Sequence, residues 1–195
     1  MNAMLTRART ILQAEADAIQ NIPLDTNFCK AVTVLSKCKG KVITTGMGKA
    51  GTMAKKMAGT LCSTGTPSCF LHPGESAHGD LGLIDSKDII IAFSTSGKTR
   101  EVIEMLQRAS LLGIKQIIGI TSHPDSEIRK LCTIVLNMGG IKEPCKLGLT
   151  PTASTTVMLA LADTLALVLM EKKNFTKKQY GIRHHGGYLG HMARK

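Results

Sequence analysis

A run of consecutive apolar residues, Ile89 to Phe93 in the segment KDIIIAFS, constrains the fold of this chain more than any other feature. A strand with one face in solvent alternates apolar and polar residues, whereas a strand covered on both faces is apolar throughout. Covered strands of this kind are typical of parallel sheets, in which helices pack on both faces. We therefore predict a buried strand over 87–94, inside a parallel sheet.

The rest of the chain repeats this pattern, with short apolar segments separated by segments of helical periodicity. Further strands are predicted over 41–45, 67–72, 115–121 and 132–137. Helices are predicted over 3–20, about 25–37, the segment after Gly48, 98–112, the short stretch SEIRKL and about 154–172. Consecutive parallel strands need right-handed crossovers. The prediction is a doubly wound, three-layer α/β sandwich with a five-stranded parallel sheet and two extra N-terminal helices.

The length of 195 residues suits one domain with a full core. Within it, residues 1–38 form the N-terminal helices and 39–173 the core of sheet and helices. The segment 174–195 looks loosely packed on its pattern alone.

The formal net charge of +11 favours anionic ligands or a solvated basic surface, because the Lys and Arg residues are spread along the chain. The chain has no Trp, two Tyr and four Phe, too few for the stacking platforms that bind single-stranded nucleic acid. We expect no nucleic-acid partner, and phosphorylated ligands are the better interpretation of the charge.

The six cysteines show no CxxC spacing, and several lie in apolar segments such as TLCST. We expect buried thiols in a reducing cytoplasm. The N-terminus lacks the core of a signal peptide. The most apolar segment, 157–170, is interrupted by Asp163 and is short for a membrane span, so we expect a buried core helix and no membrane partner.

The segment AFSTSGKT, Ala92 to Thr99, combines hydroxyls, a glycine and a predicted helix start after the buried strand. Ligands of such sheets bind at the carboxyl ends of the strands, and helix N-termini bind anions. The segment also fits a relaxed phosphate-loop pattern of NTPases, but Ala92 stands where that pattern has a glycine. The predicted strands IGIT and IVLN also lack the acidic end that would hold magnesium. Phosphate binding is the prediction, with an NTPase as the weaker alternative.

The same edge of the predicted sheet carries four other loops, TGMGKAG, HPGESAHGD, TSHPDS and EPCKLGLTPTAS, of which the first two are rich in glycine or in ionisable residues. Gly46, Gly48 and Gly51 in GMGKAG match a dinucleotide fingerprint, but the next strand ends without the required acidic residue. Lys49 at a helix start opposes the helix dipole, which indicates an anionic ligand, although an exposed surface lysine is an alternative. The loop HPGESAHGD is dense in histidines and acids and has no metal-ligand spacing, which favours substrate contact or proton handling.

Taken together these segments resemble the SIS (sugar isomerase) domain family, and within it the D-arabinose-5-phosphate isomerases. The motifs are TGMGKAG, STGTPSCFLHPGESAHGDLG, IAFSTSGKT, KEPCKLGLTPTASTT and RHHGGYLG, in the family's order over about 44–190. The resemblance implies a flavodoxin-like fold and the interconversion of D-ribulose 5-phosphate and D-arabinose 5-phosphate through an enediol(ate). That reaction opens the route to Kdo, a sugar of lipopolysaccharide and some capsules, and it requires no redox cofactor.

The resemblance also assigns roles to residues of this sequence. The implied catalytic residues are Lys49, Glu101, Glu143 and His184. The implied substrate-binding residues are Gly46, Gly48, Gly65, Thr66, His78, Ser94, Thr95, Ser96, Gly97, Thr99 and His185. His72 matches a position associated with a divalent metal that inhibits. The resemblance leaves open whether Glu101 or His184 is the base. Glu101 as an exposed helix residue, and Glu143 as the partner of a lysine, are the structural alternatives.

This sequence departs from the family's pattern at several positions. Thr95 and Lys98 stand where Asn and Glu are frequent, and His185 replaces a proline, which leaves open whether His184 or His185 faces substrate. The chain ends at Lys195, before the paired CBS domains of many relatives. CMP-Kdo remains a candidate product ligand.

The resemblance implies a homo-oligomer, a dimer or tetramer, in which segment 174–195 completes an active site. Two rival interpretations are an isomerase of another phosphosugar and a non-catalytic domain that senses a sugar phosphate or CMP-Kdo.

Overall fold

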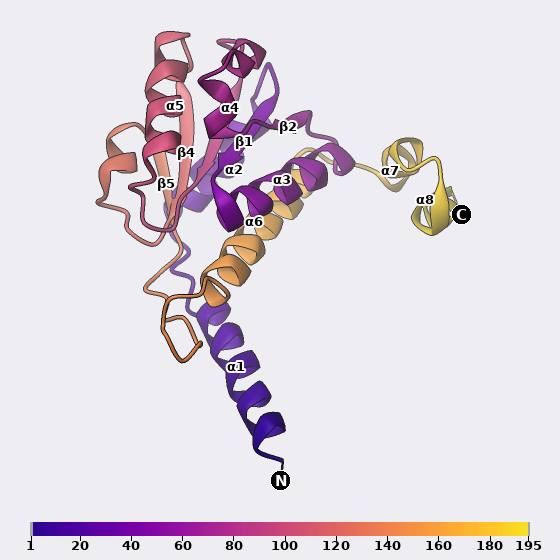
Figure 1. Ribbon diagram of the computed structural model, residues 1–195. Helices are drawn as coiled ribbons and strands as arrows, with labels where there is room; N and C mark the ends of the chain where they lie inside the picture. Colours follow the sequence, from indigo (N-terminus) through magenta and orange to yellow (C-terminus); the bar gives the residue numbers. More distant parts are fainter. Residues whose placement is uncertain (1, 195) are drawn as a thin grey trace.

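The computed structural model describes residues 2–194 as an α/β fold with a single sheet (Figure 1). In chain order the elements are α1 (Ala3–Gln20), α2 (Thr26–Ser36), β1 (Val42–Gly46), α3 (Gly48–Ser63), β2 (Ser68–Phe70), α4 (Pro73–Ser76), the short 3₁₀ helix η1 (Asp80–Leu83), β3 (Ile89–Phe93), α5 (Arg100–Leu111), β4 (Gln116–Thr121), the 3₁₀ helix η2 (Glu127–Lys130), β5 (Ile134–Asn137), α6 (Ala153–Lys172), α7 (Lys177–Arg183) and α8 (Gly187–Arg194).

The sheet has five parallel strands in the order β2-β1-β3-β4-β5, which confirms the predicted fold class. The isoleucine run forms β3 at its centre, where Ile91 lies opposite Thr44 of β1 and Ile118 of β4. All five residues of β3 are buried, as a strand covered on both faces requires.

Two apolar cores, one on each face of the sheet, make the three layers. Ile89, Ile91 and Phe93 face the larger core, which α2, α3 and α6 cover. Ile90 and Ala92 face the other core, which α5 covers. Successive side chains of a strand point to opposite faces, so one apolar run supplies both cores.

The helix α6 is long and apolar enough to cross a membrane by length and composition. Nine of its residues are buried, and it packs against α1, α2 and α3. An ion pair from Lys56 of α3 to Asp163 accounts for the charge inside its apolar sequence. The expectation of a core helix is confirmed.

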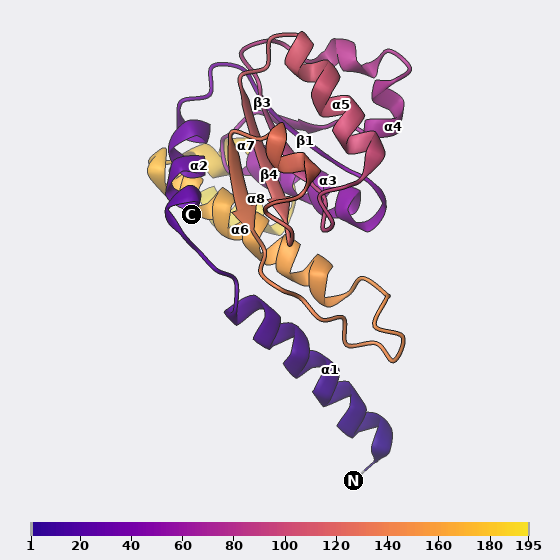
Figure 2. The same ribbon diagram turned by 90° about the vertical axis from the view of Figure 1, so that its left-hand side faces the viewer.

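Two ends of the chain project from this body. The helix α1 has no buried residue and extends beyond the sheet alongside the start of α6 (Figure 2). After α6 the chain forms α7 and α8, which pack chiefly on each other (Figure 1). A capping box of Thr176 and Gln179 begins α7. The sequence T-x-x-Q was a signal for this helix that the expectation of a loosely packed tail did not use.

The expectation of buried thiols is wrong for most of the cysteines. Among the residues that the structure describes, Cys132 alone is buried, while Cys29 and Cys62 are exposed. Both exposed residues lie on helices, where an apolar neighbour in the sequence points to a different face.

Candidate active site

A cavity of about 360 Å³ opens at the carboxyl ends of β1 and β3. In this strand order, β1 is followed by a helix on one face of the sheet, and β3 is followed by a helix on the other face. In open α/β sheets, ligands bind in the crevice between two neighbouring strands whose helices lie on opposite faces. The residues that line it are Met47, Lys49, Ala50, Ser94, Thr95, Ser96, Thr99, His123, Pro151 and Thr155. The loop predicted to bind phosphate therefore shares one cavity with Lys49.

The phosphate loop, residues 94–99, is held in shape by its own hydroxyls. Ser94 is 2% exposed, and its Oγ lies 2.8 Å from Oγ1 of Thr99 and accepts a 3.1 Å hydrogen bond from the amide of Gly97. Ser96 Oγ accepts from the amide of Lys98 at 3.2 Å. Three of the four hydroxyls of the loop, those of Ser94, Ser96 and Thr99, thus shape it, which a plain helix cap would not require.

Gly97 fixes the loop against the segment that follows β4. Its φ of +64° is a left-handed conformation that favours glycine. A Cβ there would lie 1.8 Å from Oγ of Ser126, and the Gly97 carbonyl accepts a 3.0 Å bond from the amide of Ile128. A side chain at position 97 would separate the two segments.

Three helices of at least twelve residues begin at this cavity. They differ in whether a side chain accepts hydrogen bonds from their first backbone amides. The N-cap residues of α3 and α5, Met47 and Thr99, form no side-chain cap hydrogen bond. The first amides of α6 are instead bound by Glu143, whose carboxylate accepts from the Thr152 and Ala153 amides at 2.9 Å and from the Ser154 amide at 3.2 Å. The protein's own carboxylate occupies the α6 terminus, while no side-chain cap is formed at α3 and α5, and amides at such helix starts can bind an external anion.

These contacts set the ionisation of Glu143. Burial raises the pKa of its carboxyl, but the hydrogen bonds from Ser154, Thr152 and Ala153 outweigh burial and lower the pKa below its ordinary value. Glu143 is therefore held as a carboxylate. The alternative of a lysine partner is wrong, since its hydrogen-bond donors are the amides that begin α6.

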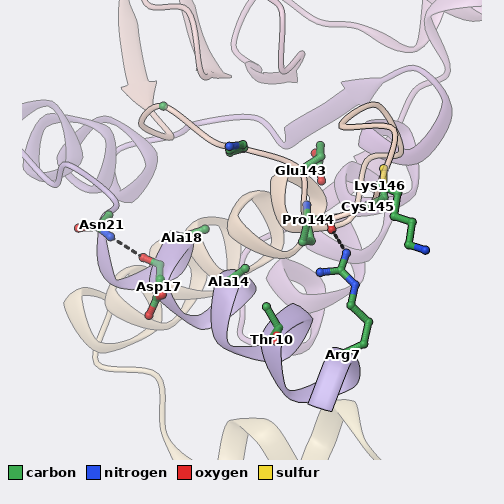
Figure 3. Close-up of a pocket in the computed structure, with 12 residues that line it drawn as sticks. Arg7, Thr10, Ala14, Asp17, Ala18, Asn21, Glu143, Pro144, Cys145 and Lys146 are labelled. Atoms are coloured by element: carbon green, nitrogen blue, oxygen red, sulfur yellow. Dashed lines mark hydrogen bonds between the residues drawn. The ribbon is translucent and has the colours of Figure 1, made fainter. Parts of the chain in front are cut away.

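The segment that carries Glu143 is also tied to α1. The guanidinium of Arg7 donates to the carbonyl of Pro144, and the two elements border a groove of about 800 Å³ (Figure 3). In the close-up, Arg7 reaches from α1 toward Pro144, while Glu143 lies on the far side of that loop from α1. The N-terminal helix thus helps position the residue that caps α6.

The glycines of GMGKAG serve the turn between β1 and α3. A Cβ on Gly51 would lie 2.4 Å from the Gly46 carbonyl oxygen, and one on Gly46 would lie 3.0 Å from that of Phe93. Gly48 has φ of +54° and is exposed. Gly46 and Gly51 are therefore required for close backbone packing, and of the residues of this turn it is Met47, Lys49 and Ala50 that line the cavity.

Glu101 lies in the first turn of α5, two residues beyond Thr99, and is exposed. It lines a neighbouring cleft of about 800 Å³ between α4 and α5, together with Pro73 and Ser76. Lys49 is also exposed and forms no ion pair within residues 2–194. Both side chains are available to a ligand at this edge of the sheet.

The two histidines of HPGESAHGD lie at the start and just beyond the end of α4. His72 precedes the helix, and its buried Nδ1 has no partner within residues 2–194. His78 is exposed. No group of three metal-ligating side chains forms among the described residues, and the metal position implied at His72 stays a prediction.

The remaining predicted residues lie at the other end of the molecule. Gly65 follows α3, at the end opposite to Lys49, and its hypothetical Cβ would meet the Phe175 ring at 2.4 Å. Lys173 Nζ donates to the Gly65 carbonyl and to Thr66 Oγ1, each at 3.0 Å. His184 ends α7 beyond this point, stacked on Tyr180.

The helix α3 has 16 residues. At about 1.5 Å per residue it spans roughly 24 Å. Gly65, Thr66, His184 and its neighbour His185 therefore lie far from the cavity of the same chain, as Figure 1 also shows for α7 and α8.

His123 lines the cavity although no motif indicated it. The sequence places its loop, TSHPDS, at the carboxyl edge, and His123 lies two residues beyond the end of β4. That position at the carboxyl edge of the sheet does not indicate which side chain of the loop faces a ligand.

The family model described as SIS domain matches residues 34–168. The arabinose 5-phosphate isomerase KdsD of Pseudomonas aeruginosa is 42% identical over 185 residues, an alignment that covers 94% of this chain and 56% of that protein. The chain thus spans about half the length of the curated relatives it matches.

Solved structures of similar length also match. A putative phosphosugar isomerase involved in capsule formation from Bacteroides fragilis is 44% identical with a TM-score of 0.92, over 95% of this chain and all of that one. A protein of E. coli CFT073, solved in complex with arabinose 5-phosphate, is 35% identical with a TM-score of 0.89, over 94% of this chain and all of that one.

Proposed function

Because this chain belongs to the SIS domain family, we propose that it is an aldose–ketose isomerase that interconverts D-ribulose 5-phosphate and D-arabinose 5-phosphate. The relatives named arabinose 5-phosphate isomerase and the similar protein bound to arabinose 5-phosphate support this substrate over other phosphosugars. The proposal places the enzyme in the cytoplasm, at the entry to Kdo for lipopolysaccharide or capsule.

One observation carries the phosphate-binding part of the proposal. The uncapped N-termini of α3 and α5, the hydroxyls of the phosphate loop and Lys49 all meet at one cavity. Amides at helix starts and hydroxyls donate to a phosphate oxygen, and the helix dipole favours negative charge there. The 5-phosphate is the group of the substrate that such a site would hold.

The isomerisation itself needs a base that removes the proton beside the carbonyl and returns it to the adjacent carbon. Glu101 is the candidate within the chain, since it lies two residues past the phosphate loop and is exposed to the adjoining cleft. Lys49 would stabilise the negative oxygen of the enediol(ate). The reaction is redox-neutral, so it requires no redox cofactor.

Glu143 has a different role in this proposal from the one its motif implied. Its carboxylate already accepts three amide hydrogen bonds at the start of α6, and these lower its pKa. A carboxylate that binds protons weakly is a poor proton carrier near neutral pH. We assign Glu143 to positioning Pro151 and Thr155, which wall the cavity.

The active site would be completed by a second copy of the chain. His184, Gly65 and Thr66 lie at the opposite end of α3 from Lys49, so they serve the same substrate only if α7 of one subunit reaches the cavity of another. The exposed apolar side chains of the tail, Ile182, Tyr188 and Leu189, are surfaces that such an assembly would cover. We propose a homodimer or homotetramer with shared sites.

Incubation of the purified protein with D-ribulose 5-phosphate tests the activity, with D-arabinose 5-phosphate followed by chromatography. Turnover to arabinose 5-phosphate, and none with the unphosphorylated sugar, is the expected result. Binding of the phosphosugar without turnover would identify a sensor instead, and conversion of a different phosphosugar would identify another isomerase.

Co-expression of Glu101→Gln and His184→Asn chains tests the shared site. If the two residues come from different subunits, half of randomly paired dimers hold one intact site, and about a quarter of the wild-type activity returns. If both residues act within one chain, the mixture stays as inactive as its parents.

A further inference from the structure

The carbonyl oxygen of Thr95, inside the phosphate loop, accepts three hydrogen bonds from the end of β4 and the segment that follows it. The donors are Oγ1 of Thr121, the amide of Ser122 and Nδ1 of His123, each at 3.0 Å. The amide of His123 in turn donates to Thr121 Oγ1 at 3.1 Å. The His123 ring is therefore fixed to the loop that the phosphate would contact.

This contact decides which ring nitrogen of His123 carries the proton. A carbonyl oxygen accepts hydrogen bonds and cannot donate, so Nδ1 must be the protonated nitrogen. In the neutral ring, Nε2 then has only a lone pair, which an unprotonated phosphate oxygen would avoid. In the charged ring, Nε2 carries a second N–H. Within residues 2–194, Nε2 has no hydrogen-bond partner, and the ring lines the cavity.

We propose that His123 is a phosphate-binding residue, whose imidazolium donates from Nε2 to the phosphate of the bound sugar while Nδ1 stays bonded to Thr95. The inference rests on the proposed function for the identity of the sugar, but not for the anion itself. Because the proposed donor is the charged ring of His123, the affinity of the protein for phosphate should be higher in mildly acidic solution than in alkaline solution.

Other charged groups surround the same site. Lys49, at the start of α3, is the other ionisable side chain among the described residues that line the cavity. The phosphate loop carries Lys98, and the segment of His123 itself carries Asp125 and Glu127. The α6 side contributes Pro151 and Thr155, which do not ionise. The phosphate group itself also titrates, near pH 6 for a monoester, and this affects wild type and variants alike. The test is therefore the difference in pH dependence of phosphate affinity between wild type and variants.

Two variants separate phosphate binding from a purely structural role. In His123→Asn, the side-chain amide can still donate to the Thr95 carbonyl from the position of Nδ1, but nothing replaces Nε2. Asp125→Asn removes a charge from the same segment and leaves the imidazole in place, so it is the matched control. Circular dichroism and thermal unfolding establish that each variant is folded.

The experiment is calorimetric titration with inorganic phosphate and with D-arabinitol 5-phosphate, which cannot isomerise, at pH 6 and pH 8. We expect wild type and Asp125→Asn to lose about tenfold more affinity between the two pH values than His123→Asn does, the size of one charge-assisted hydrogen bond. Equal losses in wild type and His123→Asn would overturn the proposal.

A second measurement uses the protein without a substitution, so it tests the proposal even if the variant fails to fold. Addition of inorganic phosphate near pH 7 should move the ¹⁵N resonance of His123 Nε2 toward that of a protonated nitrogen. An unchanged resonance on saturation overturns the proposal. Both measurements are independent of turnover. If the protein shows the expected pH dependence and the resonance shift but does not isomerise the sugar, the proposed function is refuted and the role of His123 in phosphate binding stands.

Discussion

The carboxylate of Glu143 accepts a 2.9 Å hydrogen bond from the amide of Ala153, ten residues further along the chain, and so closes the N-terminus of α6. Thr152 and Ser154 donate to the same carboxylate. The contact joins the loop after β5 to the helix that forms one wall of the cavity. The same contact favours a role for Glu143 as a helix cap over a role as a proton carrier, and the two roles predict different results on substitution.

Glu143→Gln should reduce the free energy of unfolding by about 1 kcal/mol at pH 7, the size of a helix-cap contribution. Because the pKa of Glu143 is lowered in the folded protein, its contribution is present above the ordinary glutamate pKa of about 4.3 and is lost as pH falls through the folded-state value. Urea unfolding of both proteins between pH 7 and pH 3 should show the difference shrinking. Unchanged stability with a hundredfold loss of turnover would make Glu143 a proton carrier instead.

Glu101→Gln should lower kcat by roughly a hundredfold or more, since it removes an acid–base group and keeps the shape of the side chain. Glu104→Gln is the matched control, one turn further along α5. Glu104 pairs with Arg100 on the exposed surface, and we expect a change in kcat of less than about twofold. Steady-state kinetics with ribulose 5-phosphate compares them. Equal rates in wild type and Glu101→Gln would exclude Glu101 as the base.

Gly97→Ala should weaken phosphosugar binding and destabilise the fold by about 1–3 kcal/mol, because the left-handed φ and the contact with Ser126 both oppose a side chain. Gly59→Ala serves as the control. Gly59 lies inside α3, and a Cβ there would meet nothing within 4 Å. Alanine should stabilise that helix by about 0.5–1 kcal/mol. Thermal unfolding and KM measurements check both substitutions, and a Gly97→Ala protein with wild-type KM would contradict the prediction.

Asp88→Asn should destabilise the protein by about 2 kcal/mol at pH 7, the size of hydrogen bonds to a charged group. The Asp88 side chain is 1% exposed and accepts from Lys41 Nζ at 2.7 Å, the Lys41 amide at 2.8 Å and the Asp85 amide at 2.9 Å. Burial raises its pKa, but the bonds from Lys41 and Asp85 outweigh burial and lower it. The stabilisation should therefore persist above pH 5 and disappear as pH falls through the folded-state pKa. A constant difference from pH 7 to pH 2 in urea unfolding would refute this.

Cys145 should react with iodoacetamide at neutral pH much faster than Cys132. Hydrogen bonds from the Thr150 and Leu149 amides, at 3.3 and 3.4 Å, lower the pKa of the Cys145 thiol to about 7, whereas burial raises that of Cys132 to about 12. About half of Cys145 is then thiolate at pH 7. Mass spectrometry of alkylated peptides should show the Cys145 rate levelling off above pH 8. A rate that keeps rising to pH 9 would place the pKa higher.

The fold and the phosphate loop were predictable because both depend on residues that are contiguous in the sequence. The isoleucine run of β3 indicated a strand covered on both faces, as in a parallel sheet, and the loop after it carries its own glycine, hydroxyls and helix start. Parallel strands end at the same edge of the sheet, so the positions of Lys49 and Ser94 beside one cavity followed from the strand assignments.

The sequence by itself therefore determined the layers of the fold and the edge of the sheet at which the candidate site lies, and it predicted an anionic ligand for that site. Tertiary structure alone decided that Glu143 caps α6, that His123 is bonded to Thr95, and that His184 and Thr66 lie at the opposite end of α3 from Lys49. These relationships join residues that are not neighbours in the sequence, and they depend on the strand order and on how the helices and loops pack in space, which no local pattern of side chains specifies.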